Sequence, residues 1–393
     1  MKLYRNLTQA VISGLQLILE ENRHADKVIE KLLRTDPRWG ARDRKFIAET
    51  IYDIIRWLRK YREASPGGHW HLLAAWLTDH NIALPPWDEF EGMDARSIRQ
   101  QLESTASTRA IAQSIPDWLD QLGASELGER WEPELAALNT PAPVTLRTNI
   151  LRNTRRELDA MLTDEGIETI PASDHPDALH LKTRLNVFRT AAFQEGRFEV
   201  QDAGSQTIAP FLQVASGMRV IDACAGAGGK TLHLAALMNN TGRIIALDTE
   251  DWKLEELRKR ARRAGIHSIE TRVIESNKVI RKLYDSADRL LLDVPCSGLG
   301  VLRRNPDTKW KLSPEVISRT RELQQQILTD YAPMVRTGGL LVYATCSILP
   351  SENEQQVQTF TERNPDFILQ EERRCWPSEG TDGFYMARLI RNK

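Results

Sequence analysis

The 393-residue sequence contains only four cysteines, and no two of them form a Cys-x-x-Cys pair. A zinc site built on paired cysteines is therefore excluded, and we expect no bound metal. The sequence also lacks any run of about 18 apolar residues, so no membrane-spanning helix is predicted. Its first residues lack the uninterrupted apolar core of a secretory signal, which indicates a cytoplasmic protein with reduced thiols.

Net charge is nearly absent as well, at −1. The overall composition therefore gives no sign of a nucleic-acid-binding protein. The charge is uneven, with a modest basic excess in residues 1–65 and an acidic excess in residues 66–138. A basic excess of this size usually forms a solvated face, so it supports nucleic-acid binding only weakly. We expect a monomer.

The hydrophobic pattern divides the chain into three parts. Residues 1–138 carry apolar side chains at helical spacing and predict an all-α bundle. Residues 142–205 mix strand-like segments with a helix that Gly166 ends, which predicts a small α/β domain. Residues 206–393 alternate short apolar strands with helices, which predicts a parallel sheet covered on both faces.

An apolar strand, a turn of small residues and a helix follow one another in RVIDACAGAGGKT, residues 219–231. Glycines in the turn let the backbone approach a ligand and leave helix N–H groups free to bind it. A phosphate-binding loop is excluded because Cys224 stands where that motif requires glycine. Asp248 ends the next strand and would accept hydrogen bonds from ribose hydroxyls. On these residues alone, a nicotinamide dinucleotide and S-adenosylmethionine both remain open as ligands.

Three of the four cysteines follow predicted parallel strands: Cys224, Cys296 in LLLDVPCSG and Cys346 in LLVYATCS. Ligands of open α/β sheets bind outside these strand ends. A single buried cysteine is commonly a small hydrophobic residue, and we interpret Cys375 in that way. Two thiols that are each followed by serine, close to Asp293, instead indicate nucleophilic chemistry.

Methyl transfer to carbon 5 of cytosine requires a nucleophile of this kind. Carbon 5 is a poor nucleophile, but a thiolate that adds to carbon 6 turns the ring into an enamine that can attack a methylsulfonium. A carboxylic acid at the ring nitrogen assists the addition, and a second polar group assists the final loss of the proton and expulsion of the thiol. Asp293, Cys296 and Cys346 meet these needs.

Four segments resemble, in order and spacing, the motifs of the Sun-type (nucleolar p120-like) RNA cytosine-5 methyltransferases: DACAGAGGKT, LLLDVPCSGLGVLRRNPDTKW, YATCSILPSENEQQV and DGFYMARLI. Near the N-terminus, RDRKFIAETIYDIIRWLRKY resembles the NusB-like RNA-binding domain of the family's RsmB branch, the ribosomal small-subunit methyltransferases B. The resemblance implies a Rossmann-like class I S-adenosylmethionine-dependent methyltransferase domain with a seven-stranded, mostly parallel sheet at 206–393. An RNA-positioning α/β domain at 142–205 and an all-α NusB-like domain at 1–138 precede it. The implied substrate is small-subunit ribosomal RNA.

The same resemblance implies roles for single residues. Cys346 of the TCS motif is the implied nucleophile, and Cys296 of the PCS motif is the residue that helps to release the product. Asp293 is the implied acid that contacts the cytosine and borders the cofactor. The implied cofactor-binding residues are Cys224, Ala225, Gly226, Ala227, Gly228, Gly229, Lys230, Asp248, Asn277 and Asp293.

Two positions depart from the family pattern. Ala227 stands where proline is usual, which should loosen the turn, and Asn277 replaces a third acid near the adenine. The lost charge keeps open an RNA-binding ribosome-assembly factor without catalysis, which would bind no S-adenosylmethionine. A nicotinamide oxidoreductase is a third hypothesis, and it leaves Cys296 and Cys346 unexplained.

The substrate base must be unpaired or flipped out of its stack before its ring atoms can react. RNA-binding proteins commonly hold such segments by stacking and phosphate contacts. The basic segment just beyond the PCS motif is the predicted contact with the RNA backbone. The predicted RNA-binding residues are Arg303, Arg304, Lys309, Trp310 and Lys311.

Overall fold

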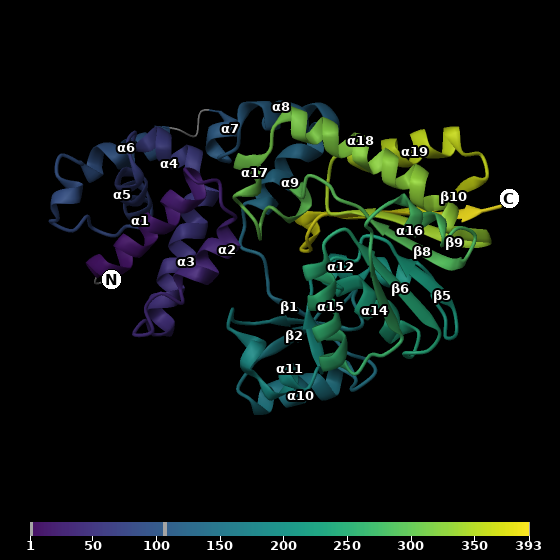
Figure 1. Ribbon diagram of the computed structural model, residues 1–393. Coiled ribbons are helices and arrows are strands. Elements are labelled where there is room, and N and C mark those ends of the chain that lie inside the picture. The colour runs from purple at the N-terminus through teal and green to yellow at the C-terminus, as the bar shows by residue number, and fades with distance from the viewer. Residues whose placement is uncertain (1–2, 105–107, 393) are drawn as a thin grey trace. The chain divides into compact units, whose positions relative to one another are not determined.

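The computed structural model describes residues 3–104 and 108–392, and these fall into two compact units (Figure 1). One unit comprises Met1–Thr140 and Leu302–Pro314, and the other comprises Pro141–Val301 and Glu315–Lys393. The separation of residues 142–205 from 206–393 into two domains stays a prediction. Within the described ranges, no helix combines the length and the apolar character needed to cross a membrane.

The first unit is all-α, as the helical spacing of its apolar residues predicted. Val11 and Leu15 of α1 and Ile47, Ile51 and Ile54 of α3 are buried in a shared core. Two 3₁₀ helices, Asp88–Phe90 and Gly128–Arg130, lie between the longer helices. The helices are α1 (Arg5–Leu19), α2 (Ala25–Leu32), α3 (Ala41–Arg56), α4 (Leu58–Ala64), α5 (His69–Asp79), α6 (Ala95–Ser104), α7 (Arg109–Ala112), α8 (Asp117–Leu127), α9 (Trp131–Leu138) and α17 (Thr308–Lys311).

Residues 302–314 belong to the helical unit although they lie far from it in sequence. Lys309 is 1% exposed, and its Nζ donates hydrogen bonds to the carbonyl oxygen of Arg56 at 2.8 Å and to Oδ1 of Asn139 at 3.1 Å. Burial lowers the pKa of Lys309 well below its usual range. Trp310 packs against the helical core and donates its ring N–H to a backbone carbonyl of α3.

These contacts give part of the segment a structural role, and its contact with RNA stays a prediction. Lys309 and Trp310 use their polar atoms within the protein, so as placed they hold the helical unit together. Arg303 is also buried, and Lys311 donates to Oδ2 of Asp307 at 2.8 Å. Arg304 is half-buried, and its contact with RNA stays a prediction.

The second unit starts with a four-stranded antiparallel sheet of order β2-β3-β1-β4. The helix of this part begins with a capping box, in which Thr154 Oγ1 accepts from the Glu157 N–H and the Glu157 carboxylate accepts from the Thr154 N–H. The sequence predicted β1, α10 and β2 but not β3 or β4. The elements are β1 (Thr145–Thr148), α10 (Arg155–Asp164), β2 (Thr169–Pro171), β3 (Ala178–Leu181), α11 (Ala191–Gln194) and β4 (Phe198–Val200), with a 3₁₀ helix at Val187–Arg189.

A seven-stranded sheet of order β10-β11-β9-β8-β5-β6-β7 forms the larger part of this unit. Neighbours from β9 to β7 pair in parallel, whereas β11 pairs antiparallel with β9, and β10 with β11. This arrangement confirms the predicted Rossmann-like class, and the chain reverses direction across the sheet between β5 and β8. The strands are β5 (Arg219–Asp222), β6 (Arg243–Asp248), β7 (Ile269–Val273), β8 (Ala287–Asp293), β9 (Val335–Thr345), β10 (Phe367–Cys375) and β11 (Phe384–Arg391).

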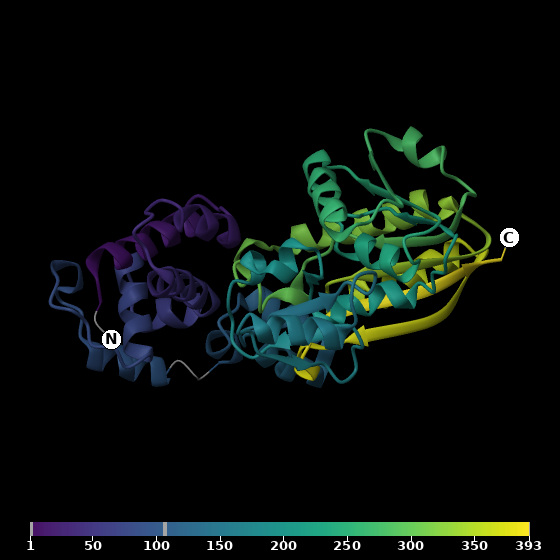
Figure 2. The same cartoon turned by 90° about the horizontal axis from the view of Figure 1, so that it is seen from below.

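Alternating apolar side chains bury both faces of this sheet. Ile221 and Leu290 pack on one face with α16, α18 and α19, whereas Val220 and Leu291 pack on the other with α13, α14 and α15 (Figures 1 and 2). Short 3₁₀ helices at Leu299–Val301, Ala332–Met334, Pro350–Glu352 and Pro377–Glu379 connect elements. The helices are α12 (Ala203–Gln206), α13 (Ile208–Phe211), α14 (Gly229–Leu237), α15 (Asp251–Ala264), α16 (Asn277–Arg281), α18 (Pro314–Tyr331) and α19 (Glu354–Arg363).

Buried charges join the small sheet to the larger one. Glu199 of β4 has a buried carboxylate that pairs with Arg260 at 2.9 Å and Arg263 at 2.5 Å, both on α15. Arg147 of β1 is also buried, which lowers its pKa to about 10, and its Nη1 donates to the carbonyl oxygen of Gly229 at 2.6 Å. The small sheet is thereby fixed to the glycine turn between β5 and α14.

The contacts of Lys309 lead to a test of stability. In Lys309→Met, the oxygens of Arg56 and Asn139 lose a buried donor, and we expect a loss of about 2 kcal/mol in the free energy of unfolding. Chemical denaturation measures this loss, with Lys31→Met, a change at an exposed lysine of the same unit, as control. Unchanged stability together with weaker RNA binding would instead indicate that Lys309 contacts RNA.

Candidate active site at the strand ends

The parallel strands bring three acidic residues to one edge of the large sheet. Asp222 ends β5, Asp248 ends β6 and Asp293 ends β8, while Cys346 directly follows β9. The carboxyl ends of parallel strands lie at the same edge, and ligands bind there beside the point where strand order reverses. The fold therefore gathers the residues that the motifs identified.

The two motif cysteines are in contact. Sγ of Cys296 lies 3.3 Å from Sγ of Cys346, and both side chains are half-buried. The contact with Cys346, together with burial, raises the pKa of the Cys296 thiol well above its usual range. Cys296 therefore keeps its proton at neutral pH and can donate it as a hydrogen bond to Sγ of Cys346.

A half-buried ion pair lies close to these thiols. Nζ of Lys230 is 2.5 Å from Oδ2 of Asp293 and 5.5 Å from the centre of the Phe384 ring. Burial alone would lower the pKa of Lys230, but the charge and hydrogen bond of Asp293, with a further contribution from Cys346, raise it above its usual value. Lys230 is therefore a permanent ammonium that fixes the Asp293 carboxylate.

A buried carboxylate that sequence reasoning missed joins the two cysteine loops. Glu352 is fully buried; its Oε1 accepts from the Ser297 N–H at 2.7 Å, and its Oε2 accepts from Oγ of Ser297 at 2.5 Å and from Oγ of Ser347. Each serine directly follows one of the motif cysteines. Glu352 lies in the quoted SENEQQV segment, but no spacing in the sequence shows that it reaches both serines.

Gly300 completes the link between the same loops. Its N–H donates to the carbonyl oxygen of Cys346 at 2.9 Å, and its own carbonyl accepts from the Gly383 N–H at 2.8 Å. A Cβ at Gly300 would collide with the Gly383 carbonyl group. Only glycine allows the backbones to approach so closely.

The glycine turn has the shape and the acceptor that an adenosyl cofactor requires. Gly226 and Gly228 adopt left-handed conformations, with φ of 53° and 86°. A Cβ at Gly226 would meet nothing within 4 Å, so the turn borders open space. Asp248 is held beside it, because Oδ2 accepts from the Gly226 N–H and Oδ1 from the Glu250 N–H, both at 2.9 Å. This carboxylate can accept hydrogen bonds from ribose hydroxyls.

The other predicted cofactor residues differ in their surroundings. Cys224 packs against the apolar core, and burial raises the pKa of its thiol, so only its backbone suits the turn. The carbonyl of Ala227 accepts from Nη1 of Arg260 at 2.8 Å, which opposes the loosening expected from alanine in place of proline. Asn277 is exposed at the start of α16, and its contact with a cofactor stays a prediction.

Asp222 is the last residue of β5, and it connects this strand to α14 on the other side of the turn. It is 1% exposed; its Oδ2 accepts from Oγ1 of Thr231 at 2.7 Å, and its Oδ1 has no hydrogen-bond partner within the residues that the structure covers. Burial raises the pKa of Asp222 to about 7, although Thr231 lowers it in part. The folded protein therefore retains a proton that an unfolded chain releases in mildly acidic solution.

This proton predicts a pH-dependent effect of Asp222→Asn. In the unfolded chain Asp222 ionises above about pH 4, whereas in the folded protein it ionises only near pH 7. Ionisation therefore favours the unfolded chain between these values, and this group lowers the free energy of unfolding as the pH rises from 4 to 7. Asparagine removes the ionisation, and the stability of the variant relative to wild type should rise between pH 4 and pH 8 by up to roughly 4 kcal/mol. Denaturant melts at several pH values measure it, with the exposed Asp164→Asn as control. A difference independent of pH would contradict the assignment.

Known proteins match this chain in sequence and in fold. The family described as 16S rRNA methyltransferase RsmB/F matches residues 209–390, and the ferredoxin-like domain of RsmF/B-like methyltransferases matches residues 115–188. Ribosomal RNA small subunit methyltransferase B of Vibrio cholerae is 36% identical over 309 residues, which cover 76% of this chain and 68% of the relative. The protein of the same name from Salmonella enteritidis is 28% identical over 100% of both chains. The crystal structure of PH0851 has the same fold, with a TM-score of 0.84, 23% identity and 99% of both chains covered.

These matches agree with the arrangement of the strand ends. The matched family region spans the glycine turn, Asp248 and both motif cysteines. The Vibrio cholerae relative covers most of the chain at an identity that implies common descent. The chain therefore belongs to the RsmB/F family of methyltransferases and uses S-adenosylmethionine as its cofactor.

Proposed function

We propose that the protein methylates carbon 5 of a cytosine in small-subunit ribosomal RNA through a covalent bond between Sγ of Cys346 and carbon 6 of the base. The contact between the Cys296 and Cys346 sulfurs, beside the Lys230–Asp293 pair, carries this proposal. Transfer of a methyl group to nitrogen or oxygen requires no thiol nucleophile, whereas transfer to carbon 5 does. The names of the relatives support ribosomal RNA as the substrate, and this substrate supports a cytoplasmic location.

The first chemical step is addition of the Cys346 thiolate to carbon 6. The Sγ–C6 bond forms as the ring π-bond opens, and the negative charge moves to the ring nitrogen and carbonyl oxygen. Asp293 would contact the cytosine ring, which is the role that the family resemblance implies for it. The Lys230 ammonium next to it stabilises the added negative charge. Carbon 5 thereby becomes the nucleophile.

Gly226, Gly228 and Asp248 would hold the cofactor, with Asp293 at its border. When bound there, S-adenosylmethionine supplies the electrophilic methyl group. The arginines that bind the carbonyls of Ala227 and Gly229 keep the turn in place beside the open space at Gly226.

Product release requires two bonds to break. After carbon 5 has been methylated, a base such as solvent water takes its proton. The electrons of that C–H bond re-form the ring double bond as the Sγ–C6 bond breaks and the thiolate leaves. The Cys296 thiol can donate a hydrogen bond to Sγ of Cys346 and stabilise it as a leaving group. This arrangement supports the release role that family resemblance assigns to Cys296.

The two thiols therefore predict opposite results on mutation. Cys346→Ala removes the nucleophile and should reduce methylation by at least about 10⁴-fold, without any covalent adduct. Cys296→Ala keeps the nucleophile but weakens its release, so a protein–RNA adduct should accumulate. Methyl incorporation from labelled cofactor and a denaturing gel measure the two results.

Cys375→Ala is the matched control, since this half-buried thiol contacts Thr207 and lies in β10. It should methylate at the wild-type rate without an adduct. An active Cys346→Ala enzyme would refute the covalent mechanism, and bisulfite sequencing of treated ribosomal RNA would identify the modified base.

The buried carboxylate of Glu352 predicts a third result. In Glu352→Gln, an amide N–H₂ group faces serine hydroxyls that need an acceptor, so the cysteine loops should shift apart. A displacement of about 1 Å costs about 100-fold in rate. We expect this loss in kcat, with little change in KM for the cofactor.

Adduct formation separates positioning from folding. In a Cys296→Ala background, Glu352→Gln should slow the appearance of the adduct by a similar factor, and circular dichroism should show a folded protein. Glu362→Gln, at an exposed position of α19, is the control and should be neutral. Adduct formation at the unchanged rate would show that Glu352 does not position the thiols.

A further inference from the structure

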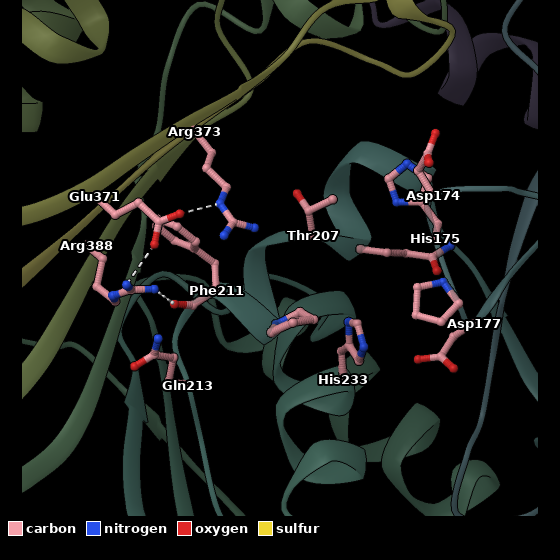
Figure 3. Close-up of a pocket in the computed structure, with 13 residues that line it drawn as sticks. Asp174, His175, Asp177, Thr207, Phe211, Gln213, His233, Glu371, Arg373 and Arg388 are labelled. Carbon is pink, nitrogen blue, oxygen red and sulfur yellow. Dashed lines mark hydrogen bonds and ion pairs between the residues drawn. The ribbon is translucent and has the colours of Figure 1, made fainter.

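A second cavity, of about 290 Å³, lies in the same unit as the strand-end site but shares no residue with it (Figure 3). The loop before β3 forms one wall, and β10 and β11 form the opposite wall. Residues of α12, α13 and α14 line the space between them. Nothing in the proposed methyl transfer uses this cavity.

His233 of α14 is the first sign of a ligand. Its side chain lines the cavity and is 97% buried (3% exposed), yet neither ring nitrogen has a hydrogen-bond partner within the described residues. Burial, with the charge of Arg147, lowers the pKa of His233 well below its usual range, so the ring is neutral. A neutral imidazole offers one N–H donor and one acceptor nitrogen. Buried polar groups in folded proteins nearly always have partners.

Asp177 stands near His233 on the loop wall (Figure 3). Its carboxylate is half-buried and makes no hydrogen bond within the part of the chain that the structure describes. Burial raises the pKa of Asp177, while the charges of Arg147 and Arg155 lower it in part. An ionised carboxylate in this position has two oxygens that can accept N–H groups of a ligand.

The opposite wall presents a positively charged group. Arg373 lies on β10 and Arg388 lies on β11. Their guanidinium groups are 5.1 and 4.8 Å, respectively, from the centre of the Phe211 ring. Arg388 is bound by Glu371 and by the carbonyl of Phe211. Arg373 donates only its Nε to Glu371, and Figure 3 shows its guanidinium end directed toward the cavity. Its terminal N–H groups suit an anionic oxygen.

We propose that this cavity binds one guanosine nucleotide, with the guanine edge on Asp177 and His233 and the phosphate on Arg373. Guanine carries two neighbouring N–H donors for a carboxylate, and its O6 and N7 atoms accept from an imidazole N–H. Adenine and cytosine have a single amino group and pair less well with a carboxylate. The volume is at the lower limit of about 300 Å³ for ligand pockets, which suits one nucleotide and no more.

The nucleotide has two sources, free guanosine monophosphate or a guanosine of the RNA substrate. The second source rests on the proposed function, because it requires that the protein act on RNA. Binding of the free nucleotide does not, and it is measured without cofactor or methylation. The two proposals can therefore fail separately.

Isothermal titration of the full-length protein with guanosine monophosphate tests the site. We expect guanosine monophosphate to bind, and Asp177→Asn and Arg373→Gln should each weaken this binding by about tenfold. Adenosine and cytidine monophosphates should bind to the wild-type protein about tenfold more weakly than guanosine monophosphate does. Asp164→Asn and Arg156→Gln remove charges at exposed positions of the same unit and should bind as wild type does. The test variants lie at half-buried Asp177 and exposed Arg373 because a change at buried His233 could unfold α14.

The RNA arm uses the same variants. A raised KM for RNA at unchanged kcat in Asp177→Asn and Arg373→Gln, without binding of the free nucleotide, would support a guanosine within the substrate. Two results overturn the proposal. One is no binding together with an unchanged KM, and the other is binding that the variants or the choice of base do not alter.

Discussion

The proposed chemistry depends on keeping two sulfurs in contact, although they lie on loops that follow different strands. The carboxylate of Glu352 provides that constraint, since it accepts hydrogen bonds from the serine next to each cysteine. A buried carboxylate is costly unless donors surround it. Separation of the loops would break at least one of these hydrogen bonds to the buried acid. The position of each sulfur is therefore coupled to the other through a group that touches neither.

Hydrogen bonds from residues that are distant in sequence also hold the glycine turn in place. The carbonyl groups of Ala227 and Gly229 accept hydrogen bonds from two arginines. Arg147 and Arg260 supply these hydrogen bonds, and Glu199 pairs with the second of them. The small antiparallel sheet thus takes part in shaping the cofactor turn, in addition to any contact that it makes with RNA.

Much of this arrangement could be predicted from the sequence. The strands β5 to β9 were identified from short apolar runs, and parallel pairing then required Asp248, Asp293 and Cys346 to share one edge. Glu352 and Arg147 could not be identified in that way, because their partners are distant in sequence and only the fold brings them together. The strands β10 and β11 were expected only through family resemblance.

The structural role of the basic segment could not be predicted for a related reason. Lysine and arginine in a row indicate charge but not exposure, and the pattern cannot show that Lys309 is enclosed by carbonyl and amide oxygens. Roles for Asn277 and Arg304 stay predictions, since neither side chain is placed against a ligand.

The inserted position of residues 302–314 has a consequence for dividing the chain. A fragment that stops at Thr140 would lack the Trp310 side chain that packs on its core, and a fragment that starts at Pro141 would carry that tryptophan and Lys309 without their partners. Neither truncation gives a self-contained piece. Gene fusion or exchange of the helical part between relatives would therefore succeed only if both stretches were transplanted together.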